Sequence, residues 1–115
     1  MQVPKPTEAD KERFRSLVPA DPEVEVKPMF GNLGAFVNGN MFMGLFGPDV
    51  GVKLAADDAI ALRAVEGAGP FGPAERPMSG WVTLPASSLG SAAAAGWIRR
   101  ALDHVAAMPP KPVKG

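Results

Sequence analysis

The glycine-rich segment at residues 67–72 has the spacing of a phosphate-binding loop. It reads Gly-Ala-Gly-Pro-Phe-Gly, which matches the pattern G-x-G-x-x-G. Such a loop binds phosphate when a strand leads in and a helix leads out, because free backbone amides and the helix N-terminus then face the anion. Here a helical pattern precedes the glycines, and Pro70 removes one amide from the loop. We therefore expect a structural loop without a nucleotide.

The other residues that could do chemistry are isolated from one another. His104 is the only histidine and the chain has no cysteine, so a zinc site would need His104 with carboxylates alone, an unusual ligand set. Ser79 does not lie in a G-x-S-x-G motif. Asp57 and Asp58 are adjacent, so on a helix they point about 100° apart and are expected to act as caps. The sequence therefore predicts no catalytic residue, no metal and no cofactor.

Three residues are candidates for a partner surface, namely Lys53, Arg76 and Met78. Lys53 lies in a predicted strand whose apolar side chains point to the opposite side of the strand, so the Lys53 side chain should face solvent. There it would either blunt a sheet edge or contact a partner. Arg76 and Met78 belong to the loop expected at residues 67–80.

The composition excludes several classes of partner. Twelve basic and twelve acidic residues cancel, so no overall field attracts nucleic acid or an anionic membrane, and direct nucleic-acid binding is not expected. No segment has the ~18 apolar residues of a membrane span. The absence of cysteine is compatible with a reducing compartment. We expect a cytoplasmic protein that does not contact membranes.

Four consecutive strands are predicted within residues 24–54. Asn38-Gly39 favours a two-residue type I′ turn, whose two central residues both need positive φ. The segment 41–46 is almost entirely apolar, which predicts a central strand. Pro28 cannot donate to a ladder, which favours an edge position.

Helices are predicted before and after these strands. Thr7 is expected to cap a first helix, Asp57 or Asp58 to start a second that runs to Val65, and Ser91 to cap a third that ends near Met108. The third helix has an apolar stripe in which Trp97 is expected to be core. Residues 67–80 predict a long ordered loop anchored by Phe71, and residues 80–84 a short strand. The order α-β-β-β-β-α-β-α predicts an α+β fold of two layers, with helices packed on an antiparallel sheet.

Several short motifs occur together in a recognisable order. They are Met29-Phe30-Gly31, Val37-Asn38-Gly39, Met41-Phe42, Lys53-Leu54, Pro70-Phe71, Arg76-Pro77-Met78 and the strand from Trp81 to Pro85. In this order and spacing the chain resembles the N-terminal domain of the TfoX/Sxy family of bacterial competence regulators. The resemblance implies a stand-alone N-terminal domain similar to the secretion-chaperone-like fold, without the family's C-terminal domain. It also implies a role in assisting transcription of competence genes through protein contacts. Asn32 stands where the family commonly has a second glycine, and asparagine tolerates the left-handed conformation.

These observations predict one domain at residues 1–108 and a flexible tail rich in proline and lysine at residues 109–115. The first functional hypothesis is a non-enzymatic regulatory or adaptor module that binds a protein through a sheet edge, an exposed strand face or the loop around Arg76 and Met78. The alternative is a small-ligand binder with a pocket between the four strands and the 67–80 loop. Homodimerisation through an uncovered strand is compatible with both hypotheses.

Overall fold

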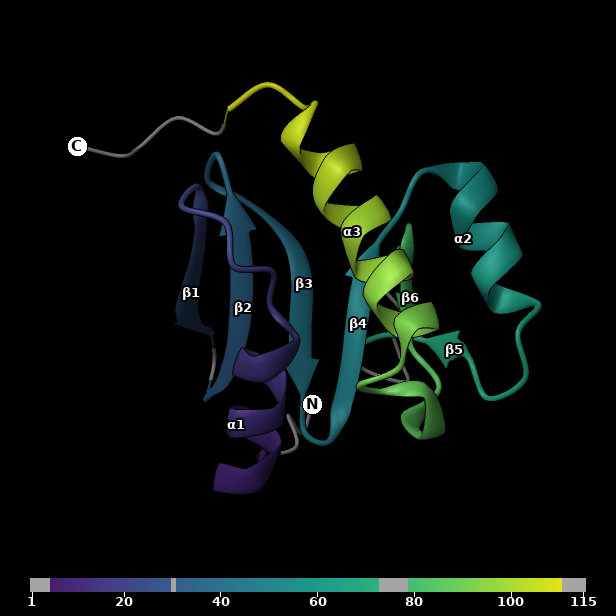
Figure 1. The fold of residues 1–115 in the computed structure, drawn as a ribbon, viewed down its shortest axis with the longest axis horizontal. Coiled ribbons are helices and arrows are strands. Elements are labelled where there is room, and N and C mark those ends of the chain that lie inside the picture. The colour runs from purple at the N-terminus through teal and green to yellow at the C-terminus, as the bar shows by residue number, and fades with distance from the viewer. Residues whose placement is uncertain (1–4, 30, 73–78, 111–115) are drawn as a thin grey trace.

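The computed structural model describes residues 5–29, 31–72 and 79–110. It has an α+β architecture with one antiparallel sheet in the order β1-β2-β3-β4-β6-β5, as Figure 1 shows. The strands are β1 (Val24–Met29), β2 (Asn32–Val37), β3 (Asn40–Phe46), β4 (Asp49–Lys53), β5 (Gly69–Pro70) and β6 (Trp81–Thr83). The helices are α1 (Glu8–Leu17), α2 (Ala56–Arg63) and α3 (Ala92–Ala106), with a short 3-10 turn η1 (Ala86–Ser88). The predicted fold class and element order are confirmed.

The first four strands form a meander because each connection is a tight turn. Asn38 and Gly39 join β2 to β3 with φ values of 53° and 79°, which confirms the predicted turn. Between β2 and β3 the register shifts, since Ala35 pairs with Met43 and Phe36 pairs with Met41. Phe42 is the extra residue of this bulge, which lets both Phe42 and Met43 be fully buried.

Local caps fix the ends of α1 and α3. The Thr7 hydroxyl accepts a hydrogen bond from the Asp10 amide, and the Asp10 carboxylate accepts one from the Thr7 amide. This pairing holds the pKa of Asp10 below its usual value, mainly because of the bond from the Thr7 backbone. The Ser91 hydroxyl caps α3 by accepting from the Ala94 amide. Both predicted caps are confirmed.

The three helices cover one face of the sheet (Figure 1). They bury one cluster with the strand residues that point toward them. Its fully buried side chains include Phe14 of α1, Leu62 of α2, Ile98 and Val105 of α3, and Phe42, Met43, Val50, Val52 and Val82 of the strands. No helix in the described part of the chain is long and apolar enough to span a membrane.

Three sequence predictions about local structure are corrected. Residues Gly69–Pro70 form a strand paired with β6, where a loop was expected; proline is tolerated because β5 lies at the outer edge of the sheet. The cap position of α2 is Ala55, so Asp57 and Asp58 lie in the first turn, where their charge complements the helix end. Trp97 is half-buried at the margin of the core, with the Arg100 guanidinium 5.6 Å from its ring centroid.

The end of α3 is tied to the β2–β3 turn. Asn38 Nδ2 donates to the Ala106 carbonyl at 3.4 Å, and Asn40 Nδ2 donates to the Pro109 carbonyl at 3.1 Å. The Ala106 carbonyl is one of those that a helix end leaves without an internal partner, and Pro109 belongs to the segment after the helix. The boundary placed at residue 108 stays a prediction, and residues 111–115 lie outside the described residues.

Candidate functional site

Of the three predicted partner-surface residues, the structure describes only Lys53. It lies at the end of β4, opposite Trp81 of β6, and it is half-buried. The prediction that Lys53 blunts a sheet edge is wrong, because β6 pairs along the outer side of β4 and makes β4 an interior strand. Arg76 and Met78 lie outside the described residues.

Lys53 belongs to the sheet face that the helices leave uncovered. Side chains alternate between the two faces of a strand, so Gly51 and Lys53 point away from the face that buries Val50 and Val52. The same alternation places Glu25, Lys27 and Met29 of β1 and Phe36 of β2 on this second face. Among the described residues no helix packs on it. We call it the helix-free face.

A row of glycines crosses the middle of the helix-free face. Gly34 pairs with Gly44 and Gly44 with Gly51, so three neighbouring strands present no side chain there. A Cβ at Gly44 would lie 3.3 Å from the Phe71 ring, and one at Gly51 would overlap that ring. The glycines therefore make room for an aromatic ring to lie against the backbone of the sheet.

Phe71 closes the β4–β6 half of this face. Its ring stacks on Trp81 at 5.4 Å between centroids and meets Phe46 edge to face at 6.1 Å. Phe71 and Trp81 are 4% and 5% exposed, which confirms Phe71 as the anchor of its segment. The ring fills space over the strands near the position where a small-ligand pocket was expected. That pocket stays a prediction.

The β1–β3 half of the helix-free face is more open. Met29, Phe36 and Met41 are half-buried and surround Gly34, where an added Cβ would lie 2.8 Å from Met41 Sδ and 3.0 Å from Phe36. Lys27 Nζ lies 5.3 Å from the centroid of the Phe36 ring, a cation–π distance. Apolar groups and a lysine are thus accessible on one surface.

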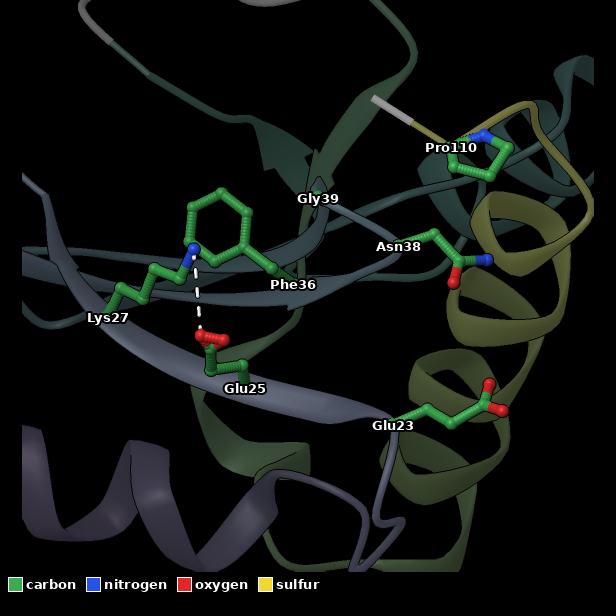
Figure 2. A pocket seen from close by; sticks show the side chains of 7 residues that line it. All are labelled: Glu23, Glu25, Lys27, Phe36, Asn38, Gly39 and Pro110. Carbon is green, nitrogen blue, oxygen red and sulfur yellow. Dashed lines mark ion pairs between the residues drawn. The ribbon is translucent and has the colours of Figure 1, made fainter. Parts of the chain in front are cut away.

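Charged residues border this open half. Lys27 Nζ lies 3.6 Å from Glu25 Oε2, and both side chains are at least half exposed. Figure 2 shows the two residues beside Phe36. All three residues line a hollow of about 350 Å³. Its other lining residues are Glu23, Asn38, Gly39 and Pro110. This hollow lies at the β1–β2 end of the sheet and is distinct from the pocket expected near residues 67–80.

Lys53 supplies a second cation on the helix-free face. No carboxylate from the part of the chain that the structure describes lies within ion-pair distance of it. Lys27 and Lys53 come from β1 and β4, with the exposed parts of Phe36 and Met41 on the strands between them. The face therefore combines apolar surface with positive charge at both sides.

The other candidate groups of the sequence do not form a chemical site in the described part of the chain. His104 is half-buried on α3, and within the glycine-rich segment Gly69 and Pro70 form β5. Within residues 5–29, 31–72 and 79–110, no three histidine, cysteine, aspartate or glutamate residues come together in a metal-binding group.

Sequence reasoning missed the role of Asn32. Its side chain is 4% exposed, and its Oδ1 accepts a hydrogen bond from the Gly47 amide at 2.8 Å, which ties the start of β2 to the β3–β4 turn. The left-handed residue in this turn is Gly31, with φ of 82°, so Asn32 does not need that conformation. Phe36 and Lys27 were also absent from the predicted partner-surface residues, although the strand alternation gave a signal for both.

Comparisons with known proteins identify one family. The model described as the TfoX N-terminal domain matches residues 5–105, which is most of the 115-residue chain and includes every helix and strand of the sheet except the last residue of α3. Comparison with curated proteins and with solved structures found no match. The expected likeness to the secretion-chaperone-like fold stays a prediction.

Proposed function

We propose, from the premise that this chain belongs to the TfoX N-terminal domain family, that it is a non-enzymatic regulatory or adaptor module that acts by contact with another protein. It would regulate the transcription of competence genes and act in the cytoplasm. The observation that carries the proposal is the open half of the helix-free face, where Phe36 and Met41 are accessible between Lys27 and Lys53.

The apolar part of this surface suits protein recognition. An aromatic ring supplies contact area at little entropic cost, and thioethers are flexible enough to repack against a partner. Met29, Phe36 and Met41 are tied to paired strands, so their backbone is ordered before binding and the entropic cost of association is lower. The sheet thus presents these side chains in a fixed arrangement.

The charges indicate the chemistry of the partner. Two lysines beside an apolar surface complement a segment that combines apolar residues with aspartate or glutamate. The carboxylates would approach Lys53, which has no described carboxylate near it, while apolar side chains cover Phe36 and Met41. We therefore propose an acidic, apolar protein segment as the ligand of the helix-free face.

Site-specific photocrosslinking in the native cell tests this proposal. A photoreactive phenylalanine analogue is placed at Phe36 in one variant and at Arg99 in the control, because Arg99 is exposed and lies on α3. We expect one dominant crosslinked protein at position 36 that is absent at position 99. Charge reversal by Lys53→Glu in the position-36 variant should remove that band. The same crosslinks at both positions, or none at position 36, would contradict the proposal.

A further inference from the structure

The outer edge of β1 has no strand beside it among the described residues. β1 ends the sheet order, pairs with β2 on one side, and exposes its four central residues from Glu25 to Pro28. Val26 is 37% exposed and is one of the few large apolar side chains at the surface. An exposed edge with an apolar residue at its centre is a template for pairing with another strand.

Pro28 shows which backbone groups of β1 point outward. It is paired opposite Leu33 and has no N–H, so its position in the ladder is one whose amide side faces away from β2. Backbone direction alternates along an antiparallel strand, so Val26 shares this outward phase. The Val24 amide is already used, because it donates to the Asp21 carbonyl at 3.0 Å. The N–H and C=O groups of Val26 are therefore the pair available to a further strand.

The charge pattern of β1 is complementary to that of a second copy of β1 that runs antiparallel to it. Glu25 and Lys27 lie one residue before and one residue after Val26, and both point to the helix-free face. When two copies of β1 run antiparallel with Val26 opposite Val26, each Glu25 comes opposite the Lys27 of the other copy. The pattern therefore fits a second copy of this chain in one register.

We propose that β1 is a homodimer interface, in which two copies pair antiparallel about Val26 and form one continuous sheet of twelve strands, six from each copy. The two Val26 residues exchange both backbone hydrogen bonds. Glu25 and Lys27 then occupy the closely spaced, non-hydrogen-bonded pairs, whose side chains interact best. The interface is isologous, as two-fold symmetry requires.

This inference does not rest on the proposed function, since it is argued from the edge of the sheet; Lys27 is the one residue that belongs to both the edge and the proposed recognition surface. The two are compatible because the helix-free faces of both copies lie on the same side of the joined sheet. A dimer would present two such surfaces to a partner at once, which raises the avidity for a partner with repeated segments.

Charge-reversal variants test the proposed register. Their self-association is measured by analytical ultracentrifugation at protein concentrations up to about 1 mM, which detects even weak specific dimers. Glu25→Lys alone and Lys27→Glu alone should each weaken self-association by about 10-fold to 100-fold, because both cross-strand pairs become repulsive. Mixed in equal amounts, the two variants should associate at least as well as the wild type, since each pair again joins opposite charges. A monomeric wild type, or a mixture that stays monomeric, would overturn the proposal.

Disulfide trapping supplies a second test, made clean by the absence of cysteine from the chain. Residues opposite each other in a hydrogen-bonded antiparallel pair have Cα atoms about 5.5 Å apart, within the range that a disulfide spans. Val26→Cys should therefore crosslink to a covalent dimer under mild oxidation. Ile60→Cys is the control, because Ile60 is 65% exposed on α2. Equal crosslinking at both positions, or none at position 26, would overturn the proposed pairing.

Discussion

The two faces of the sheet differ in how their side chains are covered. On one face, three helices enclose branched and aromatic side chains such as Val50, Val52 and Phe42, all nearly inaccessible. On the other, the strands carry a row of glycines, and Phe71 and Trp81 close the half near β4 and β6. The two faces therefore have different roles, one in stability and the other in recognition. The covered face supplies most of the buried apolar area, and the open half of the helix-free face is available to a partner.

The largest expected effect is on the free energy of unfolding when a phenylalanine ring is removed from each face of the sheet. Phe42→Ala should lower the free energy of unfolding by about 3 to 5 kcal/mol, because Phe42 is fully buried. Phe36→Ala should lower it by about 1 kcal/mol, because Phe36 is half-buried. Urea unfolding measures both. Equal losses would show that the helix-free face is as much a core as the covered face.

A methyl group added beneath Phe71 tests the closed half of the helix-free face. Gly51→Ala should cost about 1 to 3 kcal/mol, because the new Cβ would overlap a ring held by Trp81 and Phe46. Gly69→Ala is the matched control and should change stability by less than about 0.5 kcal/mol, since a Cβ there meets nothing within 4 Å. Thermal unfolding distinguishes the two. If Gly51→Ala is neutral, Phe71 does not lie on the sheet as described.

An added methyl group on the outer surface of α3 should stabilise the protein, in contrast to the one at Gly51. Gly96 is exposed in the helix interior, and an added Cβ meets nothing within 4 Å. Gly96→Ala is expected to raise the free energy of unfolding by about 0.5 to 1 kcal/mol, because alanine loses less backbone entropy in a helix. The adjacent Ala95→Gly change should lower it by a similar amount. Destabilisation by Gly96→Ala would mean that another group packs on this surface.

The smallest effect is the pH dependence of the α1 cap. The pKa of the Asp10 carboxyl is lower in the folded state than in the unfolded chain. The ionised carboxylate therefore stabilises the folded protein fully above the unfolded pKa of about 3.9. That contribution is lost as pH falls through the folded pKa. The melting temperatures of wild type and Asp10→Asn should therefore differ at pH 6 and converge toward pH 3. A constant difference over this range would contradict the capping role.

Features that depend on neighbouring residues could be predicted from the sequence. The Asn38-Gly39 turn follows from the φ values that the turn needs, and the caps at Thr7 and Ser91 follow from side chains that reach amides three residues away. The central position of β3 also follows from its apolar run, because a strand buried on both faces has no polar phase.

Features that depend on distant pairing could not be predicted in the same way. An edge position remained open for Lys53 beside a partner contact, because nothing in its local sequence shows that β6 pairs beside β4 from almost thirty residues further along the chain. The Asn32 side chain bonds the amide of Gly47, fifteen residues away, and the bulge at Phe42 is visible only once β2 and β3 are in register. The open half of the helix-free face is a property of packing, since it exists only because all three helices lie on the other side.

The most direct test of the central claim is the affinity of the crosslinked partner for variants on each face, measured by titration calorimetry with the purified proteins. Phe36→Ser combined with Lys53→Glu should weaken binding by about 100-fold or more while the protein stays folded, as expected for loss of an apolar anchor and reversal of a charge. Arg99→Glu on α3 should leave the affinity unchanged. If the Arg99 variant loses binding and the Phe36 and Lys53 variant keeps it, recognition belongs to the helical side and the account is wrong.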